Sequence, residues 1–232
     1  MLDVGGHQFE VFRSNTLEWP EDQTLRQAVR QFFEQQRGVL EPEGAVLGKI
    51  FTARNLWLIG GLKIHWTTNL ADHLRLSDED QTISIFHLQS FLQFNESFAE
   101  PVFPDGLIKE TLRTLALLFP QNDKNSRSWV KAQIKYASLD PSLASCGVLS
   151  AQDRRFERFD FWRDRLIILK QAFDESSPRT LTQWWNDRRN SVQWYTFWVA
   201  IMVFFFTLLF GFIQSAEGAL QVWLAWEGRG SK

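Results

Sequence analysis

The feature that most constrains this chain is an uncharged apolar run at residues 194–213, WYTFWVAIMVFFFTLLFGFI. None of its twenty residues is charged, and six of them are Phe. A helix of this length rises about 30 Å, which matches the hydrocarbon thickness of a bilayer. A helix in the core of a soluble protein normally keeps a polar stripe over such a length, and this run has none. The run therefore predicts a transmembrane helix, which we assign to residues 191–214.

Aromatic and basic residues before this run predict where the chain meets the membrane. Tryptophan and tyrosine favour the membrane interface, and cytosolic flanks are enriched in Lys and Arg. The residues assigned to this boundary are Trp184, Trp185, Arg188, Arg189, Trp194, Tyr195 and Trp198. Beyond the run, the two basic residues are opposed by two acidic ones. The charge bias therefore places residues 1–189 in the cytosol.

After the run the chain stays apolar but is interrupted by polar residues. Residues 222–226, VWLAW, are too few to cross a bilayer by themselves. Residues 215–226 either continue the membrane helix or lie in the interface as an amphipathic segment, and the sequence leaves both alternatives open. Residues 215–232 are assigned as an interfacial or lumenal tail.

The N-terminal residues bear on how the chain is inserted. The opening MLDVGGHQFEVFRS lacks the apolar core of a secretory signal and carries Asp3 and Glu10. The apolar run is then the insertion element, which predicts a tail-anchored, single-pass protein. Its moderate hydrophobicity and few downstream charges favour the ER over mitochondria. The single cysteine, Cys146, permits no intramolecular disulfide and suits a reducing compartment.

Small and polar residues recur along one side of the predicted membrane helix. Positions 200, 207, 211, 214 and 218 are spaced by 7, 4, 3 and 4, and 211 with 215 adds a small-xxx-small pair. Such a face lets two helices approach closely, which favours a homo-oligomer formed through the membrane helices. The face consists of Ala200, Thr207, Gly211, Gln214, Ser215 and Gly218.

Residues 1–149 mix helical and strand-like patterns, which predicts a cytosolic α+β domain that is mainly helical. Apolar residues at helical spacing predict helices at 19–37, 70–74, 107–119 and 129–137. Alternation of polar and apolar residues predicts strands within 1–16 and at 82–87, the second with one buried face. Two apolar runs on either side of Gly60-Gly61 predict a pair of strands within 51–66.

Residues 150–190 predict long stalk helices between this domain and the membrane segment. Ser150 and Asp153 are suited to cap a helix over 151–174, and a second helix restarts at Pro178. Apolar residues of the first helix step by 3, 4, 3 and 4, a narrow seam typical of packing along another helix. They are Phe159, Trp162, Leu166, Leu169 and Phe173.

The residues do not form a recognisable catalytic or metal-binding pattern. His65, His73 and His87 are separated by 8 and 14 residues, which matches no compact zinc site. The sequence has neither a Gly-rich phosphate loop nor a nucleophile elbow. The net charge is −2 with both signs interspersed, which does not favour a nucleic-acid surface. We therefore predict no enzymatic activity, no metal or cofactor and no nucleic-acid partner.

Three segments carry a family resemblance: FDFWRDRL at 159–166, QWWNDRRNSVQWYTFWVA at 183–200 and FGFIQSAEGALQV at 210–222. RTLALLFP at 113–120 adds to it. Together they resemble a poorly characterised family of filamentous-fungal proteins, in which Trp-Trp and Asp-Arg-Arg precede a single C-terminal transmembrane helix. The resemblance covers residues 107–226. It implies a membrane-anchored cytosolic domain and supplies no catalytic residue.

The sequence thus favours a membrane-anchored, non-enzymatic interaction or signalling module, with the lipid bilayer and an unidentified protein as partners. The alternative is a homo-oligomeric membrane channel or transport component. A cytosolic domain that leads through a long helix into a C-terminal membrane segment resembles the layout of CorA-like magnesium channels. The second span and the Gly-Met-Asn loop of that family are missing from this sequence. In such a channel, Gln214 would line the pore.

Overall fold

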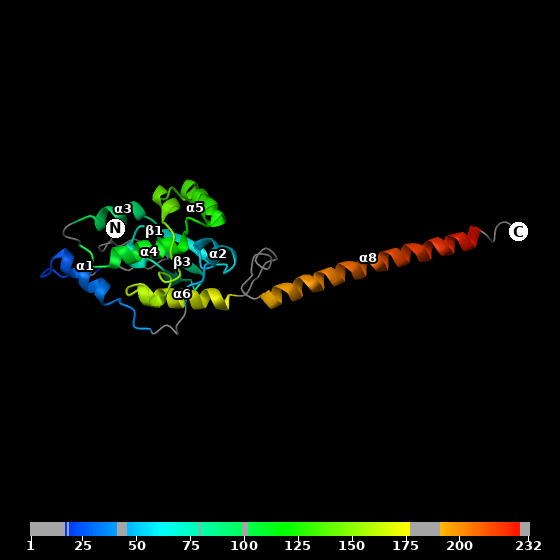
Figure 1. Ribbon diagram of the computed structural model, residues 1–232, viewed down its shortest axis with the longest axis horizontal. Coiled ribbons are helices and arrows are strands. Elements are labelled where there is room, and N and C mark those ends of the chain that lie inside the picture. Colours follow the sequence, from blue (N-terminus) through cyan, green and yellow to red (C-terminus); the bar gives the residue numbers. More distant parts are fainter. Residues whose placement is uncertain are drawn as a thin grey trace. The chain divides into compact units, whose positions relative to one another are not determined.

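The computed structural model describes residues 17, 19–40, 46–78, 80–98, 102–176 and 191–227 (Figure 1). The chain divides into two compact units, Met1–Pro178 and Arg179–Lys232. The strand predicted within 1–16 and the helix predicted from Pro178 lie outside the described residues. The same holds for four of the predicted boundary residues, Trp184, Trp185, Arg188 and Arg189.

A three-stranded sheet forms the centre of the first unit. Strand β3 (Thr82–Phe86) pairs in parallel with β1 (Lys63–Thr67) and antiparallel with β2 (Arg75–Ser77), so the order is β1-β3-β2. The predicted strand at 82–87 is confirmed, but all five residues of β3 are buried. Successive side chains of a strand point to opposite faces, so both faces are covered and the prediction of one buried face is wrong. Strand β2 was not predicted.

The first helix of the unit shows how a short sequence signal sets a boundary. Helix α1 spans Leu25–Glu34 and buries Ala28, Val29 and Phe33. Thr24 and Gln27 form a reciprocal capping box that fixes the first turn. The predicted helix at 19–37 is therefore confirmed in a shorter form, because its first residues form a turn before the cap.

The prediction of two strands around Gly60-Gly61 is half wrong. Residues before the glycines form helix α2 (Ala53–Leu58), and only the segment after them is a strand, β1. The Thr52 side chain caps α2 by accepting a hydrogen bond from the Asn55 backbone N–H at 3.3 Å. Gly61 adopts a positive φ of 70°, which lets the chain turn from helix to strand.

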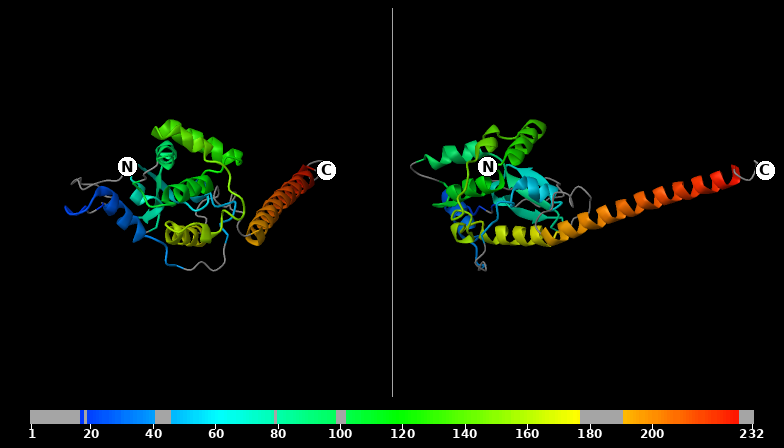
Figure 2. Two further views of the ribbon diagram at one scale, coloured as in Figure 1. Left: turned by 60° about the vertical axis from the view of Figure 1, so that its left-hand side comes forward. Right: turned by 45° about the vertical axis from the view of Figure 1, so that its right-hand side comes forward.

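Helices cover the sheet and complete the α+β character of the unit (Figure 2). Helix α4 confirms the predicted helix at 107–119, and the short helix predicted at 70–74 is a single 3-10 turn. Helix α5 begins at Lys124 rather than 129, because Asp123 caps it by accepting hydrogen bonds from two backbone N–H groups. The elements are η1 (Leu70–Asp72), α3 (Gln89–Glu96), α4 (Leu107–Leu118), α5 (Lys124–Ala137) and η2 (Pro141–Ser145).

The region predicted as a stalk folds differently. Ser150 and Asp153 do bond to each other, with hydroxyl to carboxylate at 2.6 Å, but they close a turn rather than start a helix. A 3-10 turn, η3 (Phe156–Arg158), follows, and helix α6 spans Arg163–Glu175. The single helix predicted over 151–174 is therefore wrong in its first half.

The stalk itself is not confirmed, because α6 belongs to the first unit. All five residues of the predicted helix-packing seam are buried there, with Trp162, Leu166 and Leu169 fully inaccessible. Trp162 meets the ring of Phe33 edge-to-face at 6.2 Å, which ties α6 to α1. The seam is thus part of the core of the unit.

The second unit is dominated by helix α8, which spans Ser191–Glu227. Its 37 residues correspond to about 55 Å of helix. The alternative left open by the sequence is resolved, because residues 215–227 continue the helix without a break.

Candidate functional site

Helix α8 exposes an apolar surface that water does not favour. Its segment Trp194–Trp223 has a mean hydropathy of 2.4. This segment is long enough and apolar enough to cross a membrane. None of its most apolar window is buried against the described chain, and Phe204 and Phe212 are 65% and 75% exposed. A contiguous apolar surface of this size indicates contact with lipid or with another protein surface.

The structure brings together the three predicted boundary residues that it describes. The Trp194 ring lies 5.2 Å from that of Tyr195 and 6.0 Å from that of Trp198. Aromatic rings with one polar edge favour the headgroup level of a bilayer. The composition of this end of the helix is therefore suited to an interface, and the assignment of these residues to a membrane boundary stays a prediction.

The small-residue face of α8 is open in the described chain. A Cβ atom added at Gly211 or Gly218 would meet nothing within 4 Å. The hydroxyls of Thr207 and Ser215 donate to Val203 and Gly211 carbonyls of their own helix, each at 2.8 Å. These hydroxyls are therefore satisfied without a partner helix. Ala200, Gln214 and Gly218 repeat on the same side at helical spacing.

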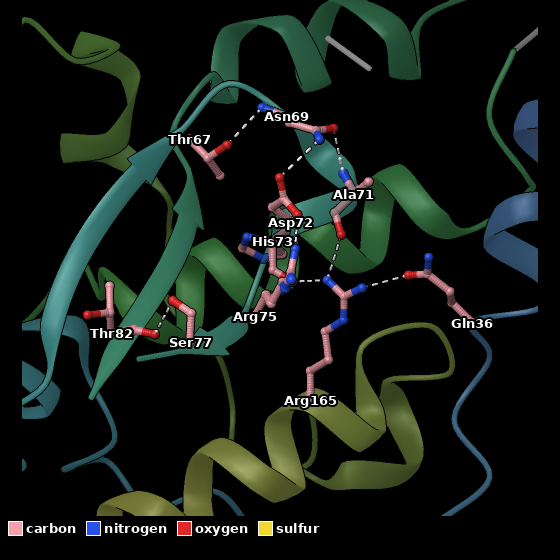
Figure 3. A network of polar contacts seen from close by, with 10 residues as sticks. All are labelled: Gln36, Thr67, Asn69, Ala71, Asp72, His73, Arg75, Ser77, Thr82 and Arg165. Atoms are coloured by element: carbon pink, nitrogen blue, oxygen red, sulfur yellow. Dashed lines mark hydrogen bonds and ion pairs between the residues drawn. The ribbon is translucent and has the colours of Figure 1, made fainter. Parts of the chain in front are cut away.

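A second candidate is a polar network in the first unit, centred on Arg165 of α6 (Figure 3). Its guanidinium donates to the carbonyls of Ala71 at 2.8 Å and His73 at 2.6 Å, and to Gln36 Oε1 at 2.7 Å. It also lies over the Trp162 ring at 5.1 Å. Burial lowers the pKa of Arg165 to about 10. The side chain therefore joins α6 to the chain before β2 and to the end of α1.

Asp72 continues this network at the sheet edge. It accepts a hydrogen bond from Asn69 Nδ2 at 3.0 Å and pairs with Arg75 at 3.1 Å. Asn69 in turn donates its backbone N–H to Thr67 Oγ1 at 3.0 Å. The carboxylate is therefore held by partners from its own turn and from β2, and its role is to shape that turn.

His73 is the most deeply buried titratable residue of the network. Its Nδ1 accepts the backbone N–H of Phe86 at 3.2 Å, so the ring proton is assigned to Nε2, which lies 2.7 Å from Thr114 Oγ1. The Thr114 hydroxyl in turn donates a hydrogen bond to the Thr111 carbonyl at 2.7 Å. Burial lowers the pKa of His73 to about 3, which keeps it neutral. Both ring nitrogens are used to hold β3 and α4 together.

Glu110 serves the start of α6 in a similar way. Its carboxylate accepts backbone N–H groups from Asp160, Phe161 and Trp162 at 2.8, 2.9 and 2.7 Å. Burial raises the pKa of Glu110, while these three hydrogen bonds oppose that rise. The carboxylate from α4 thus fixes the chain just before α6, including the backbone N–H of its N-cap residue Trp162.

The histidines do not assemble into a site. His65 lies exposed on β1, His73 is buried in the network, and His87 follows β3 half-buried. Within the described ranges no group of three His, Cys, Asp or Glu side chains is placed to hold a metal ion. Cys146 donates to Gln89 Oε1 at 2.7 Å, and burial raises the pKa of its thiol to about 12. That thiol is therefore a poor nucleophile.

A shallow cavity of about 250 Å³ lies between α4 and the start of α5. Two of its charged residues are already engaged: Asp123 caps α5, and Arg154 donates to the Leu47 carbonyl at 3.3 Å. Lys49 adds a third charge to the lining. These groups support the local fold and do not define a reaction centre.

Sequence reasoning overlooked one surface, the exposed side of α5. Lys124, Arg127, Lys131 and Lys135 recur along it at spacings of 3, 4 and 4, and all four side chains are exposed. The spacing was visible in the sequence, but two of the four residues precede the start of the helix predicted at 129–137. The residues of the Arg165 network had no comparable local signal.

Comparison of the chain with protein-family models, with curated proteins and with solved structures yields no match. The resemblance to filamentous-fungal proteins therefore stays a prediction. The fold and α8 define a coarse class: an α+β unit, mainly helical, in a chain with one C-terminal helix able to span a membrane.

Proposed function

We propose that this chain is a single-pass membrane protein whose first unit acts as a non-enzymatic interaction or signalling module at the bilayer surface. The observation that carries the proposal is the contrast in exposure. The first unit buries a continuous apolar core of its own, whereas the Phe and Leu side chains at 204–212 of α8 are exposed. A bilayer supplies the apolar surroundings that α8 lacks.

In the proposed topology, residues 1–189 are cytosolic and α8 is a tail anchor, in the ER rather than in mitochondria. The Arg188-Arg189 pair before the span supports this orientation through the positive-inside rule. The rings of Trp194, Tyr195 and Trp198 support a membrane boundary at the start of α8. The partner of the module is a protein.

The small-residue face of α8 supports a second candidate, a homo-oligomeric channel or transport component. Because α8 is continuous to Glu227, Gln214, Gly218 and Gln221 fall on one side at helical spacing. In an oligomer these residues would face one another. The anchor remains the preferred function, because it requires only the exposed apolar surface.

Two measurements on the full chain test the anchor. The chain is expected to resist alkaline extraction from membranes, and protease added to sealed microsomes is expected to digest the first unit while leaving a protected fragment of α8. Release at alkaline pH would refute the membrane span. Full protection of the first unit would refute the cytosolic orientation.

Mass measurement in detergent micelles separates the two candidates. A strict monomer contradicts the channel. Ion flux in reconstituted vesicles that is abolished by Gln214→Leu contradicts a simple anchor. Phe205→Leu serves as a control, because Phe205 is exposed on the side of α8 opposite Gln214.

A further inference from the structure

Helix α5 carries a one-sided positive charge. At 100° per residue, Lys124, Arg127, Lys131 and Lys135 fall within about 80° of one another around the helix. The helix contains no acidic residue, and no ion pair among the described residues involves these four side chains. The chain as a whole has a net charge of −2, so this face is a local concentration of positive charge.

An aromatic cluster packs on the other side of α5, where Trp129 lies about 160° around the helix from the middle of the basic face. Trp57 of α2 is 48% exposed, and its ring lies 6.1 Å from Trp129 of α5. Trp129 lies 6.4 Å from Trp66 of β1, and Tyr136 near the end of α5 is 89% exposed. Three elements thus contribute to one aromatic cluster, which supports α5 from the side away from the cations and leaves the basic face exposed. A group of exposed Lys and Arg side chains on one helical face is typical of surfaces that rest on anionic bilayers.

The α2 segment contacts both the aromatic cluster and the end of α6, after which the chain leaves the first unit. Phe173, near the end of α6, contacts Phe51 with ring centroids 5.9 Å apart, and it packs close to Gly60. Phe51 and Gly60 lie at the two ends of α2, which also carries Trp57. The end of α6 and the aromatic cluster therefore both contact the α2 segment. In Figures 1 and 2, α5 lies at the periphery of the unit, with α4 between it and α6.

The tether between the units limits the available partners. Between Ser176 and Trp194 the chain reaches at most about 60 Å even when fully extended. A surface held this close to a bilayer meets lipid headgroups at a high effective concentration, which a free protein or nucleic acid does not match.

We propose that the face formed by Lys124, Arg127, Lys131 and Lys135 binds the anionic headgroups of the bilayer that α8 spans. The inference rests on the proposed membrane anchor and adds a second contact to it. The cations pair with lipid phosphates and carboxylates. Docking holds the first unit against the membrane and leaves its other faces available to a partner.

The test uses the full chain in nanodiscs, with an environment-sensitive fluorophore on Ser128→Cys. Ser128 is exposed and lies among the four cations on α5. The native thiol of Cys146 has a pKa raised to about 12 by burial, so labelling favours the introduced cysteine. In discs containing phosphatidylserine, the emission is expected to shift to shorter wavelength and to be quenched by brominated lipid. In discs of phosphatidylcholine alone, neither change is expected.

Charge-removal variants provide the decisive comparison. The ratio of docked to undocked chain is expected to fall about fivefold per cation removed, and thus about 100-fold in Arg127→Gln/Lys131→Gln/Lys135→Gln. A control that removes the same charge from exposed sites elsewhere, Lys49→Gln/Lys109→Gln/Arg158→Gln, is expected to dock normally. Raising the salt from 0.1 to 1 M shortens the Debye length from about 10 to 3 Å and is expected to undock the wild type.

The outcomes separate this inference from the anchor itself. The headgroup contact is overturned if the emission is the same with and without phosphatidylserine. It is also overturned if both triple variants lose docking equally. A shift produced only by added polyglutamate would also overturn it and would indicate an acidic protein partner. Failure of the chain to enter nanodiscs at all refutes the anchor. Incorporation into the discs is therefore measured before the fluorescence.

Discussion

The two units use the same residue types in opposite ways. In the first unit Phe33 and Trp162 are fully inaccessible, whereas Phe204 and Phe212 of α8 are 65% and 75% exposed. Hydrophobic residues lower the free energy only when something covers them. The first unit buries its own hydrophobic side chains, whereas those of α8 need lipid or another protein surface to cover them. The exposure of an apolar residue, rather than its identity, therefore distinguishes a folding core from an anchor.

The units also treat polar groups differently. The first unit buries His73 and Glu110 and gives each of them partners from distant elements. Helix α8 satisfies its backbone internally, and its Thr207 and Ser215 hydroxyls bond to the preceding turn. Internal satisfaction is what a segment in hydrocarbon requires, because no water is available there.

The largest expected effect tests whether the first unit depends on its own core. Trp162→Ala removes a fully buried side chain, its hydrogen bond to Thr111 and its contact with Arg165, and should lower the unfolding free energy by about 3–5 kcal/mol. Urea unfolding of the full chain in mild detergent measures this change. Phe204→Ala on α8 should alter the unfolding of the first unit by less than about 0.5 kcal/mol. Similar losses in both variants would erase the contrast between the units.

The next effect is acid sensitivity of the first unit. The pKa of His73 is lowered from 6.5 to about 3 by burial, so the unfolded chain binds this proton more readily than the folded chain. Stability from this group is complete above pH 6.5 and is lost as the pH falls towards 3, by at most about 1.4 kcal/mol per pH unit. His73→Gln should flatten this slope in unfolding curves, and His65→Gln should retain it. An unchanged slope in the His73 variant would assign the acid sensitivity to other groups.

A charge in the middle of α8 tests the need for lipid. Phe206→Arg places a cation near the centre of Trp194–Trp223 and should disfavour membrane insertion by about 2.5–3.5 kcal/mol. The extractable fraction at alkaline pH measures this effect, with Phe206→Leu as the control. Normal insertion of the arginine variant would mean that α8 is covered by protein instead of lipid.

The smallest effect compares two glycines, Gly60 just after α2 and Gly211 within α8. A Cβ atom at Gly60 would lie 2.7 Å from the Leu56 carbonyl oxygen and 2.9 Å from the Phe173 ring, so Gly60→Ala should cost about 1–3 kcal/mol. Gly211→Ala meets no atom within 4 Å and should leave the unfolding of the chain unchanged. Calorimetry in detergent measures both. A change in oligomer mass in the Gly211 variant alone would show that copies of α8 meet at this face.

Some of this structure was predictable because its cause is local. The uncharged run of α8, the apolar stripe of α4 and the alternation in β3 lie within a few turns or residues of chain. Each such pattern lies within one element and can be read without knowing what packs against it. The start of α1 was less predictable. The apolar Trp19 indicated an earlier start than the one that the Thr24 capping box gives.

Other features were decided by residues far apart in the sequence. The segment before Gly60 has a local cap in Thr52, but its place in the core depends on the packing of Phe51 on Phe173 of α6. Likewise α6 is part of a core and not a stalk, since its apolar seam is buried in the first unit and Glu110 of α4 holds the chain just before it.

By itself, the sequence determined that one helix here is long and apolar enough to span a membrane, because length and the absence of charge suffice for that property. Only the tertiary structure decided which polar groups meet: Arg165 bonds to Gln36 across 129 positions, and Trp57, Trp66 and Trp129 cluster from three elements. Such contacts depend on chain closure over long loops, and no local pattern of residues specifies them.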